Sequence, residues 1–218
     1  MKFYNIHSHH VVPLNNEVVI TNLFPSQSNI IKTGKYYSIG LHPWYIKKEI
    51  IDQSLKEIQK LSQAKEVIAI GETGLDKVTE TPFELQIEVF ERHIQISESI
   101  KKPLIIHCVK SFNELIQLKK KLKPKSPWIV HGFNSKPEVA EMLIKHKIIL
   151  SFGKALIYPM SNAAIGLSQI SDDSFFLETD DSKHSIKDIY KAAAKIKKID
   201  LDHLKSIVLQ NFKNCFEI

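Results

Sequence analysis

The chain has 218 residues, of which 43% are hydrophobic and 25% are charged, and its formal net charge is +6. This composition is that of a folded globular protein, and two cysteines, Cys108 and Cys215, are too few for a disulfide framework or a thiolate zinc site. No apolar run approaches the ~20 residues that cross a bilayer, and the start lacks the apolar segment of a secretory signal. We therefore expect a cytoplasmic protein with one domain, residues 1–218.

The positive charge favours a polyanionic partner but is not concentrated enough to identify one. Much of the excess lies in the run KKKLKPK, residues 119–125. Such a run is more often a solvated helix end and loop than a nucleic-acid-binding surface. Charge alone leaves the partner open.

Apolar runs of strand length recur along the chain. They are short, often β-branched, and do not alternate with polar residues, as expected of parallel strands that are covered on both faces. The predicted strands are residues 3–6, 18–20, 36–39, 67–70, 104–106, 128–130, 148–150 and 175–177.

Segments with helical periodicity lie between several of these strands. The predicted helices are residues 53–61, 84–100, 112–122, 136–146, 186–199 and 201–216. Ser135, followed by Pro137 and Glu138, predicts a helix start with Ser135 as the N-cap. Eight strands alternating with helices favour a small (β/α)8 TIM-type barrel of the α/β class. Its weakest unit is 13–35, where the sequence shows no convincing helix.

Histidines and carboxylates follow six of the predicted strands. In a (β/α)8 barrel the catalytic groups occupy the carboxyl ends of the strands, so these residues are expected at one rim. The residues in chain order are His7 and His9, His42 in GLHPW, Glu72 and Asp76 in GETGLD, His107, His131, and Asp180 in ETDDS.

His7 and His9 form the first candidate metal-binding pair. On an extended chain, side chains two residues apart leave the same face with Cα atoms ~6 to 7 Å apart, which is close enough for both to bind one ion. His10 is expected to point the other way. By itself the pair is equally compatible with two hydrogen-bonded histidines at a strand end.

The other candidates strengthen the metal hypothesis by their position. His107 and His131 each end a buried strand, and unpaired chargeable groups there would be costly to bury. Glu72 and Asp180 supply carboxylates at the same rim. Each residue alone has a structural explanation, as a core histidine, a cap or a helix start. Asp76 and Asp181 are expected to be loop or capping residues, and His42 can simply pack beside Trp44.

An ordered series of motifs runs over nearly the whole chain: NIHSHH, GLHPW, AIGETGLD, QIEVFERHIQIS, KPLIIHC, VHGF, LETDD and NFKNCF. This series resembles the TatD family of metal-dependent hydrolases within the amidohydrolase superfamily. The resemblance implies a TIM barrel with one or two metal ions, and deoxyribonuclease activity of the 3′ to 5′ exonuclease type.

The resemblance also implies roles for individual residues. It makes His7 and His9 ligands of a first metal, Glu72 a bridging carboxylate, and His107 and His131 ligands of a second metal. Asp180 becomes a ligand of the first metal that also takes a proton from the attacking water. His42 corresponds to a pocket residue near the substrate, and Asn211 to a structural position.

Three features depart from the family pattern. Asn5 stands where the family usually has Asp, so it brings no charge to the support of the metal ligands. Val109 stands where many members have Arg, and the adjacent Lys110 can meet a phosphate only as a point charge. The loop after GETGLD is short, which can change substrate preference.

The resulting hypothesis is hydrolysis of DNA phosphodiesters by a metal-activated water. Asp180 and Glu72 are the catalytic residues, His42 and Lys110 position the phosphate, and the imidazole-rich ligands favour zinc or manganese over magnesium. No membrane or obligate protein partner is expected. One alternative is a hydrolase of a small ester, amide or lactone. A second is a catalytically impaired nucleic-acid-binding homologue, which the departures at Asn5 and Val109 motivate.

Overall fold

The computed structural model describes residues 1–9 and 16–216. The chain divides into two compact units. We call Met1–Thr21 together with Val130–Ile218 the terminal unit, and Asn22–Ile129 the central unit. His10 and residues 13–15 of the weak early segment lie outside the described residues.

The strands follow one another in the sheet in the order of the sequence, and the strand pairs of each unit are parallel. This is the order of a (β/α)8 TIM-type barrel, and the predicted fold class is confirmed. The eight strands are β1 (Phe3–Ser8), β2 (Glu17–Leu23), β3 (Tyr36–Ile39), β4 (Val67–Asp76), β5 (Leu104–Val109), β6 (Trp128–Val130), β7 (Ile148–Phe152) and β8 (Phe175–Leu177).

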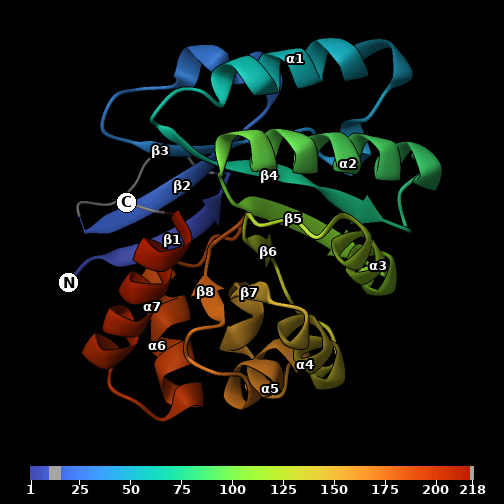
Figure 1. Cartoon of the computed structure of the whole chain (residues 1–218). Helices are drawn as coiled ribbons and strands as arrows, with labels where there is room; N and C mark the ends of the chain where they lie inside the picture. The colour runs from blue at the N-terminus through green and yellow to red at the C-terminus, as the bar shows by residue number, and fades with distance from the viewer. Residues whose placement is uncertain (10–15, 217–218) are drawn as a thin grey trace. The chain divides into compact units, whose positions relative to one another are not determined.

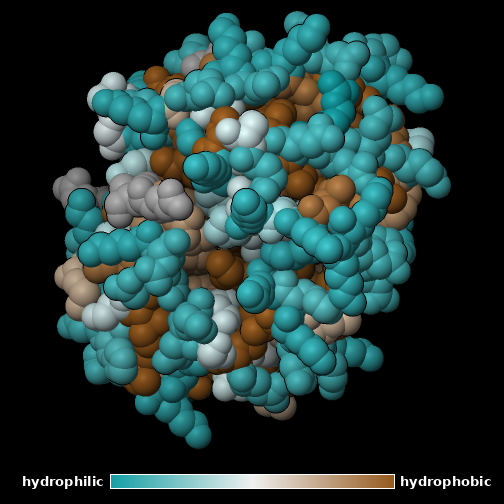
Figure 2. All heavy atoms as spheres, viewed as in Figure 1, coloured by the Kyte–Doolittle hydropathy of each residue, from teal (hydrophilic) through white to brown (hydrophobic). Residues whose placement is uncertain are grey.

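The central unit carries three helices, α1 (Ile51–Leu61), α2 (Phe83–Ile100) and α3 (Phe112–Leu122), and the short 3-10 helices η1 (Pro25–Ile30), η2 (Pro43–Tyr45) and η3 (Lys48–Ile50). Helix α2 packs on β4 with α1 beside it (Figure 1). Buried Phe90 of α2 and Ile70 of β4 belong to this core. Full burial of such side chains contributes about 1.5–3 kcal/mol each. Figure 2 shows hydrophilic side chains over much of the outer face of α1 and α2.

The terminal unit carries α4 (Pro137–Lys145), the 3-10 helix η4 (Lys154–Ile157), α5 (Asn162–Gln169), α6 (Ile186–Lys197) and α7 (Leu201–Phe216). Helices α6 and α7 lie side by side and both contact β1 (Figure 1). The hydroxyl of Tyr190 on α6 fastens this packing, since it donates to the Tyr4 carbonyl oxygen and accepts from the Tyr4 amide, both at 3.0 Å. None of the described helices has both the length and the apolar character that crossing a membrane requires.

The predicted elements agree with the structure in kind, with a few differences. Helices α3 and α7 have the predicted bounds. The described part of 13–35 contains β2 and the 3-10 helix η1 but no α-helix, as expected of a degenerate unit. Helix α5 was not predicted. The Ser135 N-cap is wrong: Lys136 occupies the cap position of α4 and makes no side-chain cap hydrogen bond, while Pro137 opens the helix as expected.

Strand β4 is longer than predicted because it continues through GETGLD at the end nearest the candidate residues. Gly71 and Gly74 have φ values of +140° and +146°, which L side chains rarely adopt. A Cβ at Gly74 would meet the His107 carbonyl oxygen at 2.0 Å. These glycines therefore let β4 approach β5 closely where Glu72 and His107 are presented.

Candidate functional site

His7, His131 and Asp180 form a cluster in the terminal unit. One ligand atom from each lies within 4.8 Å of the other two. Asp180 Oδ1 is 3.6 Å from His7 Nε2 and 3.4 Å from His9 Nε2, so His9 joins the same carboxylate. The His7 side chain is completely buried, whereas about a third of Asp180, 32%, is exposed. Four of the predicted metal ligands are thus gathered within this unit.

Main-chain hydrogen bonds hold Asp180 beside β1. Its amide donates to the His7 carbonyl oxygen at 3.0 Å, and its own carbonyl accepts from the His9 amide at 3.2 Å. Asp180 has a φ of 53°, in the left-handed region, where Asp is tolerated better than most residues. The bonds on both sides therefore fix the position from which its carboxylate projects.

Asn5 supports the same junction between β1 and β8. Its Nδ2 donates to Thr179 Oγ1 at 2.8 Å, and its Oδ1 accepts from the Thr179 amide at 3.0 Å. Both ends of the amide side chain are used, and Asn5 is buried. The neutral residue at this family position thus has a structural role next to Asp180.

Glu178 supports His131, a contact that the sequence reasoning missed. Its Oε1 lies 3.3 Å from His131 Nδ1 and accepts from the Gly132 amide at 2.7 Å. With Nδ1–H donating to the carboxylate, Nε2 is the unprotonated nitrogen of His131, and this tautomer with a carboxylate partner is typical of metal-bound histidine. Glu178 directly follows the apolar run of β8, and this position is the sequence signal that could have identified it.

Glu72, His42 and His107 form a second cluster, in the central unit. Glu72 Oε1 lies 3.1 Å from His42 Nε2 and 3.2 Å from His107 Nδ1. The Glu72 amide donates to Asn22 Oδ1 at 2.7 Å, which holds the main chain of β4 at this residue. Glu72 is 4% exposed, so its carboxylate depends on these neighbours rather than on water.

His42 acts as a hydrogen-bond donor in this cluster. Its Nδ1 accepts from the Trp44 amide at 3.1 Å, so the neutral ring carries its proton on Nε2, facing Glu72. A protonated Nε2 has no lone pair for a metal. By distance alone, a nitrogen of His42 is close enough to Glu72 and His107 to count as a ligand atom.

His107 has the opposite polarity. Its Nε2 lies 3.0 Å from Asp76 Oδ2, so the ring donates there and turns the Nδ1 lone pair towards the Glu72 carboxylate. A lone pair and a carboxylate oxygen 3.2 Å apart repel unless a cation or a proton lies between them. The donor set therefore fits a divalent ion.

Asp76 does more than the loop or capping role expected for it. Oδ1 does accept from the Val78 amide at 2.8 Å, as a turn residue would, but Oδ2 also accepts from Trp44 Nε1 at 2.7 Å and from His107. Burial raises the pKa of this carboxyl, and the hydrogen bonds from Trp44, Val78 and His107 outweigh burial, so the pKa lies below its ordinary value. Asp76 is therefore an ionised support for His107.

The basic residues are less concentrated than the acid and histidine clusters. Lys110 follows β5 with a φ of 53° and an exposed side chain. In the run 119–125, Lys119 lies over the Trp128 ring at 5.0 Å and Lys121 pairs with Glu91 at 3.0 Å. Part of this run is thus engaged in local packing, as expected of a helix end.

The sequence matches the family model described as TatD related DNase over residues 18–217. The chain belongs to the TatD family. It is a metal-dependent hydrolase of that family, with candidate His, Glu and Asp ligands in both units. Of the six residues predicted to bind metal, His7, His9, His131 and Asp180 belong to the terminal unit, and Glu72 and His107 belong to the central unit.

Relatives of this TatD protein have been described in bacteria and in humans. It is 27% identical over 199 residues to the uncharacterized metal-dependent hydrolase YabD of Bacillus subtilis, covering 84% of this chain and 78% of that protein. It is 35% identical over 150 residues to the human 3′-5′ RNA nuclease TATDN2, covering 66% of this chain but only 19% of the human protein.

Solved structures share the fold of this TatD protein. The Escherichia coli TatD homologue YjjV superposes with a TM-score of 0.84 at 19% identity, covering 99% of this chain and 98% of the other. A TatD family hydrolase from Entamoeba histolytica gives 0.80 at 17% identity, covering 99% and 98%. At such identities the likeness establishes the fold alone.

Proposed function

We propose that the protein hydrolyses phosphodiester bonds of DNA from the 3′ end, using one or two divalent ions. The observation that carries this proposal is the pair of carboxylate-supported histidines, His131 on Glu178 and His107 on Asp76. Each ring donates one nitrogen to a carboxylate and keeps the lone pair of the other, which is how proteins present neutral imidazole to a metal.

The proposed ligands are His7, His9, His131 and Asp180 of the terminal unit and Glu72 and His107 of the central unit. Four imidazoles and two carboxylates suit zinc or manganese better than magnesium, which prefers oxygen ligands and water. When bound, a divalent ion lowers the pKa of a coordinated water and neutralises charge on a phosphoryl oxygen.

The residues of the chain supply the proton transfer and the positioning. In the proposal Asp180 takes a proton from the attacking water, because its carboxylate is partly exposed and lies beside His7 and His9. His42 keeps Glu72 in place through its Nε2–H, and it and Lys110 face the phosphate of the substrate.

The proposal is tested with purified protein loaded with zinc or manganese. Single-stranded DNA labelled at the 5′ end should shorten progressively from the 3′ end, and RNA of the same sequence and a carboxylic ester are assayed in parallel. Turnover of RNA alone would move the substrate to RNA, as in the human relative. Ester turnover without nucleotide release would replace the proposal by a carboxylic ester hydrolase.

Two variants separate metal binding from proton transfer. Asp180→Asn should abolish turnover while the metal content, measured by elemental analysis, falls only in part. His7→Ala should lose the metal held at His7 and Asp180. Near-normal activity of Asp180→Asn would exclude it as the base, and a wild-type protein without bound metal and without thermal stabilisation by added zinc or manganese would favour an impaired nucleic-acid-binding homologue.

A further inference from the structure

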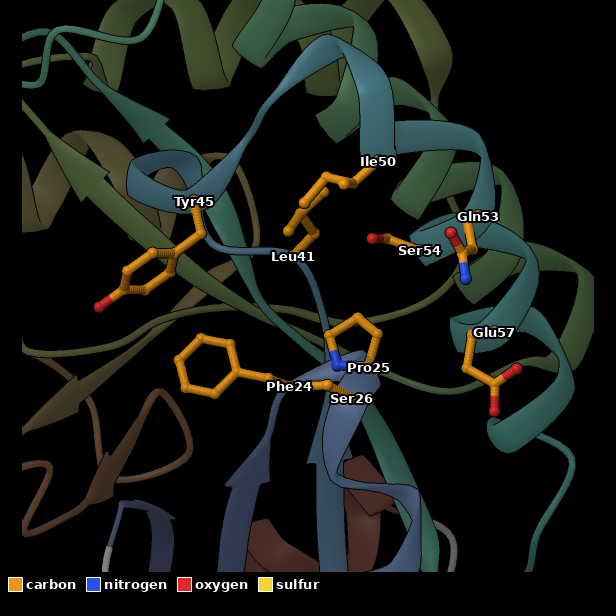
Figure 3. A pocket seen from close by; sticks show the side chains of 9 residues that line it. All are labelled: Phe24, Pro25, Ser26, Leu41, Tyr45, Ile50, Gln53, Ser54 and Glu57. Atoms are coloured by element: carbon orange, nitrogen blue, oxygen red, sulfur yellow. The ribbon is translucent and has the colours of Figure 1, made fainter.

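A pocket of the central unit, lined by none of the acid and histidine cluster residues, lies between η1, the segment after β3, and α1 (Figure 3). Its volume is about 790 Å³, within the range of small-molecule sites. The residues that line it are Phe24, Pro25, Ser26, Leu41, Tyr45, Ile50, Gln53, Ser54 and Glu57. Nothing in the proposed reaction uses these side chains.

The lining has two chemically different sides. The Phe24 and Tyr45 rings meet edge to face, with centroids 5.2 Å apart, and form an aromatic wall that Leu41 and Ile50 continue. Opposite them, Gln53, Ser54 and Glu57 come from one side of α1, and Figure 3 shows the Ser54 hydroxyl directed towards the middle of the pocket. A flat apolar ligand with polar atoms on one edge matches this division.

The charge of the pocket argues against a phosphate as its occupant. None of the nine lining residues is Lys or Arg, and Glu57 contributes a carboxylate. On the same helix, Lys60 Nζ is 4.0 Å from Glu57 Oε2, and the Lys60 side chain is 77% exposed. The pocket therefore favours a ligand edge that donates hydrogen bonds.

The pocket adjoins the cluster of the central unit. Leu41 immediately precedes His42, and the Tyr45 ring centroid lies 5.8 Å from that of His42. His42 in turn contacts Glu72 at 3.1 Å. A nucleotide whose base occupied the pocket would therefore keep its phosphate next to His42.

We propose that this pocket binds one nucleobase of the substrate strand. The inference rests on the proposed phosphodiesterase function and adds a recognition site to it. The base packs on the aromatic wall and on Leu41 and Ile50, and its edge faces Ser54, Gln53 and Glu57. Glu57 accepts from the exocyclic amino group of adenine, cytosine or guanine, whereas thymine has no amino group to offer.

The test compares two strands of equal length, one of deoxyadenylate and one with abasic sites throughout, so that only the bases differ. In the wild type, KM should be lower for the deoxyadenylate strand by about tenfold or more, because base stacking on aromatic side chains is a substantial part of single-strand binding. Ser54→Phe, which fills the pocket, should remove this advantage. Gln59→Phe, on the exposed side of α1, is the matched control.

A second variant keeps the test decisive if Ser54→Phe does not fold. Tyr45→Ala removes one ring of the aromatic wall, a side chain that is 49% exposed, and should raise KM for the deoxyadenylate strand more than for the abasic strand. Equal KM values for the two strands in the wild type, or an advantage that survives both variants, would overturn the base site.

Binding measurements separate this inference from the proposed function. If the wild type cleaves neither strand, fluorescence anisotropy of labelled strands still reports base binding. A preference for the deoxyadenylate strand that Ser54→Phe abolishes would keep the base site and refute the phosphodiesterase. No preference would refute the base site as well.

The choice of base tests the role of Glu57 directly. Deoxyadenylate and deoxycytidylate strands should bind about three- to tenfold more tightly than thymidylate, and Glu57→Gln should reduce this ratio towards one. Glu88→Gln, an exposed substitution on α2, should leave the ratio unchanged. A ratio that Glu57→Gln does not alter would exclude Glu57 from base recognition.

Discussion

His107 Nε2 lies 3.0 Å from Asp76 Oδ2, and this one contact decides which nitrogen of His107 faces Glu72. The carboxylate takes the ring proton, so Nδ1 keeps its lone pair. Asp76 is held for this task by Trp44 Nε1 and by Gln86, which accepts from the Asp76 amide at 2.7 Å and donates to its carbonyl oxygen at 3.0 Å.

Asp76→Asn should reverse the polarity of His107. With its oxygen kept at the Val78 amide, the new side chain presents its NH2 group where Oδ2 was, so Trp44 Nε1 loses its acceptor and the ring proton of His107 moves to Nδ1. We expect about 10- to 100-fold weaker binding of zinc or manganese by calorimetric titration, and a changed tautomer by ¹⁵N NMR of the ring. Asp52→Asn, which breaks an exposed ion pair with Arg92, is the control. An unchanged tautomer would remove Asp76 from this role.

Asn5 should tolerate a carboxylate but not an apolar residue. In Asn5→Asp the Thr179 hydroxyl can turn to donate, so both contacts survive and stability should change little. Asn5→Ala leaves the buried Thr179 amide without its acceptor, and should lower the free energy of unfolding by about 1–3 kcal/mol in urea titrations. Equal stability of the two variants would contradict this account.

Gly74 should be intolerant of any side chain. Gly74→Ala places a Cβ 2.0 Å from the His107 carbonyl oxygen, and should lower the free energy of unfolding by at least about 3 kcal/mol or prevent folding. Gly34 also has a positive φ, +80°, but its Cβ would meet nothing within 4 Å. Gly34→Ala should therefore cost only about 1 kcal/mol. If the two variants lose comparable amounts of free energy of unfolding in thermal melts, the backbone conformation and not the close approach of β5 would explain the need for Gly74.

His93 should make the protein sensitive to mild acid. Burial lowers its pKa from 6.5 to about 4, and the neutral ring uses both nitrogens, accepting from the Leu41 amide and donating to the Val89 carbonyl oxygen. Between these two pH values the unfolded chain binds a proton that the folded chain does not, so stability is complete above about pH 6.5 and falls as the pH approaches 4. The loss at pH 4 is roughly 3 kcal/mol.

The contribution of His93 is isolated by substitution. His93→Gln keeps one donor and one acceptor but does not titrate, so its unfolding free energy should depend less steeply on pH between 6.5 and 4 than that of the wild type. Parallel curves for the two proteins would show that other groups cause the acid sensitivity.

The strands and most helices could be predicted because each is a distinct apolar run or an amphipathic segment. Helix α5 was missed because Asn162–Gln169 is built from small residues without a clear apolar stripe. Strand β4 was cut short at Ile70 because its last part, GETGLD, is neither apolar nor alternating. The fold class was nevertheless predictable, since it depends on the order of elements and not on their exact bounds.

The candidate ligands were predictable from their positions at strand ends, but their supports were not. Glu178 and Asp76 support histidines that lie 47 and 31 residues away along the chain. Which carboxylate a ring nitrogen meets depends on ring orientation in the folded protein, and neither spacing nor composition encodes it. The pocket at Phe24 and Tyr45 could not be predicted either, because it forms only where residues from separate segments pack around a space in the folded protein.

His7 and Asp180 are far apart in the sequence, yet the Asp180 amide is hydrogen-bonded to the His7 carbonyl oxygen. During synthesis on the ribosome, His7 leaves the exit tunnel early. Its carboxylate partner, Asp180, becomes available only after β8 has also left the tunnel. A nascent or truncated chain that ends before Asp180 therefore cannot assemble the terminal-unit cluster. Under the proposed ligand assignment, the chain can acquire metal at that cluster only after most of it has been synthesised.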